Sequence, residues 1–120
     1  MEFYKFTTES GHHITEFNSN FYMKQIMMID EEAKIGLIQL NENGVIGYHQ
    51  AVTPQLLLII QGVGLVRSYS EKFCSLQPGE AVFWTQDEWH ETKTEKGLIG
   101  LIIESKIITS EQILLEKIRK

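Results

Sequence analysis

The sequence predicts an all-β domain built as a sandwich or a small barrel. Short runs rich in β-branched and aromatic residues alternate with Gly, Pro, Asn and Ser along the chain. This pattern is typical of about ten strands joined by tight turns. Asn43-Gly44 suits a hairpin, and Pro78-Gly79 suits the central positions of a type II turn. The apolar run at residues 55–61 predicts a strand that is covered on both faces.

The expected strands can be placed from these signals in chain order. Residues 1–6 contain three aromatic side chains and are expected to form an edge strand. Neighbouring pairs are expected at 65–69 with 72–76 and at 81–85 with 89–94. The complete set of expected strands is 1–6, 21–29, 33–40, 45–51, 55–61, 65–69, 72–76, 81–85, 89–94 and 98–105.

A short helix is expected only at the C-terminal end of the chain. Thr109 and Gln112 have the spacing of a capping box, and Leu114, Leu115 and Ile118 fall on one helical stripe. A helix this short needs a surface on which to dock. That surface is either its own barrel or a partner subunit.

Length and composition predict one domain spanning residues 1–120. The net charge of −5 and the isoelectric point near 5.3 disfavour nucleic-acid and anionic-membrane partners, because the long-range field repels phosphates. Cys74 is the only cysteine, which fits a reducing compartment, and no apolar run approaches membrane-spanning length. With Glu2 and Lys5 in place of an apolar signal core, we expect a cytoplasmic protein.

Two segments together resemble the paired motifs of the cupin superfamily. In the first, about residues 44–62, Gly44, His49, Gln55 and Gly62 match the family spacing, except that the glycine-to-histidine gap is one residue short. In the second, about residues 79–94, Gly79 and His90 match. Thr85, Asp87 and Thr94 stand where proline, glycine and asparagine are usual. The resemblance implies a jelly-roll barrel, to which the short C-terminal helix expected from the capping box would be added, and a homodimer.

The resemblance also implies a metal site that is degenerate in this chain. The family uses three histidines and a carboxylate, whereas here Ala51 replaces the second histidine and Gln55 replaces the glutamate. His49, Gln55 and His90 would remain as ligands of a weakly bound Zn, Ni or Fe, if any metal is held. Neutral Gln55 cannot offset the charge of a cation as a glutamate would, so metal affinity should be low.

The same three residues are the candidates for binding a small-molecule ligand inside the barrel, with Tyr48 and Trp84 as candidate pocket aromatics. Glu88 could supply the missing carboxylate if its strand begins early, but its loop position favours exposure. One of His12 and His13 could close over the pocket, although a histidine pair beside a turn is more typical of a solvated site. For each candidate the alternative is a structural role, such as a core histidine bonded to backbone.

Three function classes remain open. The first is a small-molecule-binding protein with a weak or absent metal site, such as a stand-alone ligand sensor. The second is a metal-dependent dioxygenase, isomerase or cyclase that uses His49, Gln55 and His90. The third is an interaction module whose dimer surface matters and whose barrel interior is simply filled by side chains. We favour the first because the missing charge weighs against redox or Lewis-acid chemistry. Residues 56–60 and 98–103 are apolar on both faces, which also indicates a homodimer.

Overall fold

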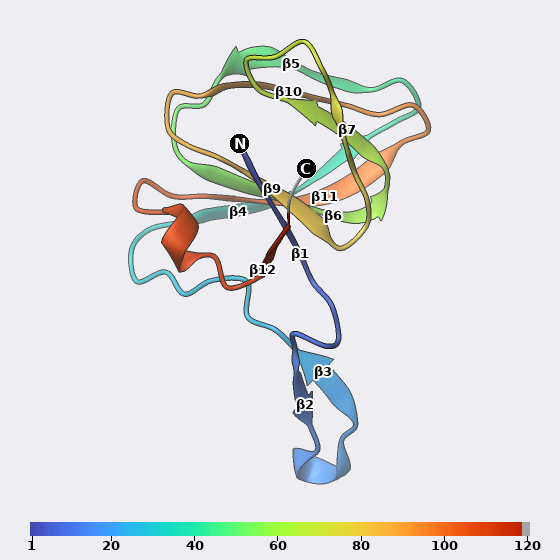
Figure 1. The fold of residues 1–120 in the computed structure, drawn as a ribbon, viewed down its shortest axis with the longest axis vertical. Helices are drawn as coiled ribbons and strands as arrows, with labels where there is room; N and C mark the ends of the chain where they lie inside the picture. The colour runs from blue at the N-terminus through green and yellow to red at the C-terminus, as the bar shows by residue number, and fades with distance from the viewer. Residues whose placement is uncertain (119–120) are drawn as a thin grey trace.

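The computed structural model describes residues 1–118 as a β sandwich from which one hairpin projects (Figure 1). A six-stranded antiparallel sheet has the order β12-β1-β9-β6-β11-β4, and a four-stranded antiparallel sheet has the order β5-β10-β7-β8. The strands are β1 (Glu2–Lys5), β2 (His12–Ile14), β3 (Phe21–Met23), β4 (Lys34–Leu40), β5 (Val45–Gln50), β6 (Gln55–Gly62), β7 (Gly64–Arg67), β8 (Cys74–Leu76), β9 (Glu80–Trp84), β10 (Trp89–Lys93), β11 (Leu98–Glu104) and β12 (Glu116–Ile118). The predicted all-β fold class is therefore confirmed.

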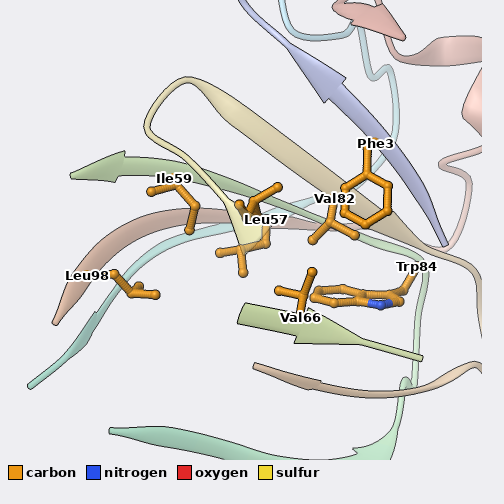
Figure 2. Close-up of a cluster of buried hydrophobic side chains, with 8 residues drawn as sticks. Phe3, Leu57, Ile59, Val66, Val82, Trp84 and Leu98 are labelled. Atoms are coloured by element: carbon orange, nitrogen blue, oxygen red, sulfur yellow. The ribbon is translucent and has the colours of Figure 1, made fainter. Parts of the chain in front are cut away.

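The main core lies between the two sheets. Figure 2 shows side chains from β1, β6, β7, β9 and β11 meeting there, with the indole of Trp84 beside Val66. Side chains alternate along each strand, so every second residue of β6 and β9 enters this core. Its buried members are Phe3, Leu57, Ile59, Val66, Leu76, Val82, Trp84 and Leu98.

A second core lies on the outer face of the six-stranded sheet. Leu56, Phe83 and Ile103 point to this face, opposite to Leu57 and Val82. Ile108, Ile113 and Leu115 cover them from the segment that comes after β11, and Ile26, Met27 and Ile29 pack there from the segment before β4. Residues 55–61 are therefore apolar on both faces because each face has its own core.

The predicted C-terminal helix is wrong. Thr109 and Gln112 do form the capping box, but it caps only a 3₁₀ turn at Ser110–Gln112. The chain then extends into β12, whose Ile118 pairs with Phe3 of β1. A local capping signal could not foresee this pairing with the other end of the chain. Residues 119 and 120, which the expected helix and the expected domain also include, lie outside the described residues.

Three pairing expectations also need correction. Residues 1–6 form β1 as predicted, but β12 lies outside it, so β1 is not an edge strand. The expected pair of β7 and β8 is confirmed, whereas β9 and β10 lie in different sheets. Asn43-Gly44 makes the predicted turn, with Asn43 at φ 61°, but it joins β4 to β5 across the two sheets and so makes no hairpin.

The predicted type II turn is present before β9. The amide of Glu80 donates to the carbonyl of Gln77 at 2.9 Å, and Gly79 has a φ of 84°, which a type II turn requires at this position. No helix within residues 1–118 is long and apolar enough to cross a bilayer.

The projecting hairpin, residues 12–23, is hereafter called the arm. It consists of β2 and β3, which pair only with each other, and a 3₁₀ turn at Glu16–Asn18 at its tip. The sequence predicts one long strand over residues 21–29, but β3 ends at Met23 and the chain then turns back to pack against the outer core. The arm itself has no counterpart among the predicted elements.

Candidate functional site

His49 and His90 are brought together by the pairing of β5 with β10. The two residues are directly opposite in the antiparallel register, so their side chains share one face of the sheet. Their ring centroids are 4.4 Å apart. His90 is 3% exposed, whereas His49 is exposed, so the pair runs from the surface toward the interior.

Backbone hydrogen bonds hold the two strands in this register beyond the ends of the ladder. The amide of Ala51 donates to the carbonyl of Glu88 at 2.9 Å, and the amide of Asp87 donates to the carbonyl of Ala51 at 2.8 Å. The side-chain amide of Gln50 also donates to the carbonyl of Asp87 at 3.0 Å. This clasp fixes the end of β5 against the start of β10.

Each histidine has its Nδ1 atom next to a backbone carbonyl. Nδ1 of His49 lies 2.7 Å from the carbonyl oxygen of Gly47, and Nδ1 of His90 lies 3.2 Å from that of Glu88. Because a carbonyl can only accept, Nδ1 carries the proton in the neutral ring, and Nε2 keeps its lone pair. Burial lowers the pKa of His90 below its ordinary value of 6.5, which favours the neutral ring.

Trp84 extends this group of rings into the barrel. Its indole stacks on His90 with the ring centroids 4.3 Å apart, and it lies between the two sheets in Figure 2. The indole is 1% exposed, and its Nε1 has no hydrogen-bond partner among the described residues. A buried donor without an acceptor lowers the free energy of unfolding by about 1–3 kcal/mol, so this atom destabilises the barrel.

Gln55 lies in a row of polar residues across the six-stranded sheet. It is opposite Trp84 of β9 on one side and opposite Glu104 of β11 on the other, and Glu104 is opposite Lys34 of β4. Directly opposite residues share a face, so this row points toward the smaller sheet. Glu104 and Lys34 were missed from the sequence. They can be found only from the register of β4, β11 and β6.

A pocket of about 660 Å³ opens at this end of the barrel. His49 and Gln55 line it from β5 and β6. Charged residues of both signs also line it, namely Glu31, Glu32, Lys34, Glu104 and Lys106. The pocket therefore combines two of the three motif residues with a charged rim, and His90 and Trp84 lie deeper behind His49.

Tyr48 does not belong with these residues, although the sequence places it among the ligand-binding candidates. It lies on the opposite face of β5, where its ring contacts Trp89 at 5.3 Å between centroids and the guanidinium of Arg67 at 4.3 Å. Alternation along β5 explains this, because neighbours of His49 point to the other face. Tyr48 packs on the outer surface of the smaller sheet.

Glu88 is buried, which corrects the expectation of an exposed loop residue. Its carboxylate accepts from Ser68 Oγ at 2.6 Å and from the Thr85 amide at 3.0 Å, and it pairs with the Met1 α-ammonium at 2.9 Å. Although burial alone would raise the pKa of Glu88, these hydrogen bonds hold it below its usual range. Its carboxylate is engaged by these donors, and only its backbone carbonyl contacts His90.

His12 and His13 lie on the arm and do not line the pocket described above. Nε2 of His13 is 2.6 Å from Oδ1 of Asn20, and its ring stacks on Tyr22 with the centroids 4.7 Å apart. His12 borders a separate hollow at the base of the arm, together with Met23 and Leu114.

The donor set at the barrel site fits a divalent metal only in part. His49 and His90 each keep an Nε2 lone pair, because their Nδ1 atoms contact backbone carbonyls, as is common for metal-binding histidines. Within residues 1–118, however, no three His, Cys, Asp or Glu side chains come together as a metal-binding group. An amide from Gln55 is the only further candidate ligand that the motif offers.

Comparison with solved structures places the fold. An RmlC-like cupin from Shewanella frigidimarina aligns with a TM-score of 0.58 and 16% identity, covering 72% of this chain and 77% of that one. A cupin superfamily protein from Desulfitobacterium hafniense aligns with a TM-score of 0.57 and 15% identity, covering 67% and 72%. A protein from Thermotoga maritima, described as a predicted oxalate decarboxylase, aligns with a TM-score of 0.52 and 18% identity, covering 57% and 62%. No family model and no curated protein matches the sequence. The architecture and these neighbours together show that the chain has the cupin fold.

Proposed function

We propose that this chain binds a small oxygenated molecule at the mouth of its barrel, with a weak metal site or none. His49 and His90 accept hydrogen bonds from the ligand through Nε2, and Gln55 offers both a donor and an acceptor. The charged rim selects a molecule that is small and polar. A stand-alone sensor or carrier is the role that this arrangement suits.

The unpartnered Nε1 of Trp84 is the observation that carries this proposal. The atom is buried beside His90, and no acceptor within residues 1–118 reaches it. A ligand oxygen that accepts from Nε1 would remove the desolvation penalty. The rings of His49, His90 and Trp84 are in contact from the pocket inward, and of the three only His49 lines the pocket. A ligand oxygen would therefore have to reach Nε1 past His49.

The test is a thermal-shift screen of sugars, polyols and hydroxy acids, with calorimetry on any compound that stabilises the protein. His49→Ala should weaken binding about tenfold or more, because it removes one acceptor from the exposed end of the histidine pair. Tyr48→Ala is the matched control from the outer face of the same strand and should leave affinity unchanged. Equal loss in both variants, or retained affinity in His49→Ala, would contradict the proposed site.

A metal-dependent enzyme of the dioxygenase, isomerase or cyclase type is the second candidate. The Nδ1 contacts with backbone carbonyls favour it, because they leave both Nε2 lone pairs available to an ion. His49, His90 and Gln55 would hold the ion, which would polarise a substrate oxygen as a Lewis acid. We expect elemental analysis of dialysed protein to show well under one equivalent of Zn, Ni or Fe. A stoichiometric metal that His49→Ala abolishes would reverse the order of the two candidates.

A further inference from the structure

The polar row crosses the inner face of the six-stranded sheet beside the pocket. It consists of Lys34 on β4, Glu104 on β11, Gln55 on β6 and Trp84 on β9, each directly opposite the next. The row lies on the inner face because Leu56, which follows Gln55, points into the outer core. Lys34 is exposed and Glu104 is half-buried, so the row runs from charged groups near solvent to a buried amide and indole.

The charged residues around the pocket do not pair with one another. Lys34 and Glu104 are directly opposite on neighbouring strands, a position in which opposite charges usually attract. The ion pairs within residues 1–118 nevertheless involve neither of them. Glu31, Glu32 and Lys106, the other charged residues that line the pocket, also take part in none of these ion pairs. The rim therefore presents separate carboxylate and ammonium groups to a molecule that enters the pocket.

Neither edge protection nor a cation site accounts for this arrangement. An inward-pointing charge can protect an edge strand from pairing with another chain, which would account for Lys34 on β4. Glu104, however, lies on β11, which is paired on both sides by β6 and β4. The three carboxylates of the rim do not converge, because no three His, Cys, Asp or Glu side chains in the described part of the chain form a metal-binding group. The rim therefore suits a ligand that carries two separate charges.

Hydrogen bonds hold together the segments that carry these charges. Ser105 Oγ donates to the carbonyl of Glu32 at 2.9 Å, which joins the end of β11 to the segment before β4. The Ser105 amide donates to the carbonyl of Pro54 at 3.3 Å, which joins the same point to the residue before β6. Ser105 is buried, so both bonds are shielded from water. The backbone beneath the rim is therefore fixed before a ligand arrives, which lowers the entropic cost of binding.

We propose that the ligand of this pocket is an amino acid, whose carboxylate pairs with Lys34 and whose ammonium group pairs with Glu104. This inference rests on the proposed function and names the class of molecule that the pocket accepts. Each contact is a charge-assisted hydrogen bond, which is stronger than one between neutral groups. Glu104 repels a simple acid and Lys34 repels a simple amine, so the same two residues disfavour ligands with one charge. A zwitterion satisfies both positions and leaves Gln55 and His49 to bind the rest of the molecule.

Isothermal titration calorimetry with matched compounds tests the proposal. The proteinogenic amino acids, β-alanine and 4-aminobutyrate are titrated into the wild-type chain, and each one that binds is compared with its hydroxy acid and its amide. The hydroxy acid lacks the ammonium group, and the amide lacks the carboxylate. The amino acid should bind about tenfold more tightly than either analogue, because each analogue loses one charged contact. A panel in which no amino acid binds would overturn the proposal.

Two substitutions assign the charged contacts to residues. Lys34→Gln should weaken binding of the amino acid about tenfold and should not weaken binding of the amide, which has no carboxylate. Glu104→Gln should weaken binding of the amino acid about tenfold and should not weaken binding of the hydroxy acid, which has no ammonium group. Glu71→Gln and Lys72→Gln are the matched controls, because both residues are exposed and do not line the pocket. An equal loss for all three compounds in either rim variant would contradict the assignment.

His49→Ala separates failure of this inference from failure of the proposed function. A sugar or polyol that binds through His49, while no amino acid binds, would leave the proposed function standing and rule out the amino-acid class. Amino-acid binding that responds to Lys34→Gln and Glu104→Gln but not to His49→Ala would support the class and count against the role of His49. Amino-acid binding that neither rim variant weakens would show that the proposed contacts are wrong.

Discussion

The structure contains two histidine–aromatic stacks with similar geometry and very different surroundings. His90 stacks on Trp84 at 4.3 Å inside the barrel, and His13 stacks on Tyr22 at 4.7 Å on the arm. The barrel stack joins β10 of one sheet to β9 of the other, whereas the arm stack joins two strands of one hairpin. The barrel stack is therefore fixed by the whole fold, and the arm stack depends only on local pairing.

This difference shows which of the two regions can hold a pre-formed ligand site. A pre-formed ligand site needs side chains that the surrounding structure holds in place, and the barrel provides this at His90 and Trp84. The arm lacks such support, because β2 and β3 form a separate two-stranded sheet. Three experiments test the contrast, beginning with the largest expected effect.

Trp84→Ala should lower the free energy of unfolding by about 3–5 kcal/mol, because it leaves a large cavity between the sheets. Tyr22→Ala, the equivalent change in the arm stack, should lower it by less than about 1 kcal/mol, since the side chain is half exposed. Urea unfolding of dilute protein measures both values. Comparable losses in the two variants would mean that the arm is as firmly held as the barrel.

Glu88→Ala should lower the free energy of unfolding by about 1–3 kcal/mol, because Ser68 Oγ and the Thr85 amide lose their acceptor in a buried turn. The pKa of Glu88 is lowered in the folded state, so its contribution is present above the ordinary value of 4.5 and is lost as the pH falls through the folded pKa. Acid titration of unfolding should show wild type and Glu88→Gln converging below pH 4.5. An unchanged gap between them would argue against this assignment.

His90→Gln should change mainly the pH dependence of stability. Because burial lowers the pKa of His90, the unfolded chain binds more protons here, and wild-type stability should fall as the pH drops below 6.5. The slope of the unfolding free energy against pH should be shallower in His90→Gln just below that pH. Identical slopes in the two proteins would show that another group controls the acid response in this range.

The sandwich could be predicted from the sequence because it depends on alternation and turn chemistry. Gly79 had to occupy the positive-φ position of its turn. The predicted coverage of residues 55–61 on both faces is confirmed for residues 55–59, whereas Ile60 is 51% exposed and Gln61 is exposed. The close approach of His49 and His90 depended on the motif spacing and on a register that the period of two specifies strongly. These are properties that short stretches of sequence can encode.

The errors arise where contacts between distant segments decide the outcome. The capping box at Thr109 is real, yet the pairing of Ile118 with Phe3 makes the last described residues a strand instead of a helix. Glu88 looked like an exposed loop residue because Ser68 and Met1, its partners, are far away in sequence. The arm and the polar row through Lys34 and Glu104 likewise have no local signature.

The clasp between Ala51, Asp87 and Glu88 consists largely of backbone atoms. The side chains at the end of β5 and the start of β10 can therefore change without weakening the pairing of the two strands. Alanine can occupy position 51 while the imidazoles of His49 on β5 and His90 on β10 keep their spacing. Because backbone atoms make most of these bonds, the pairing of β5 with β10 does not depend on which side chain stands at position 51.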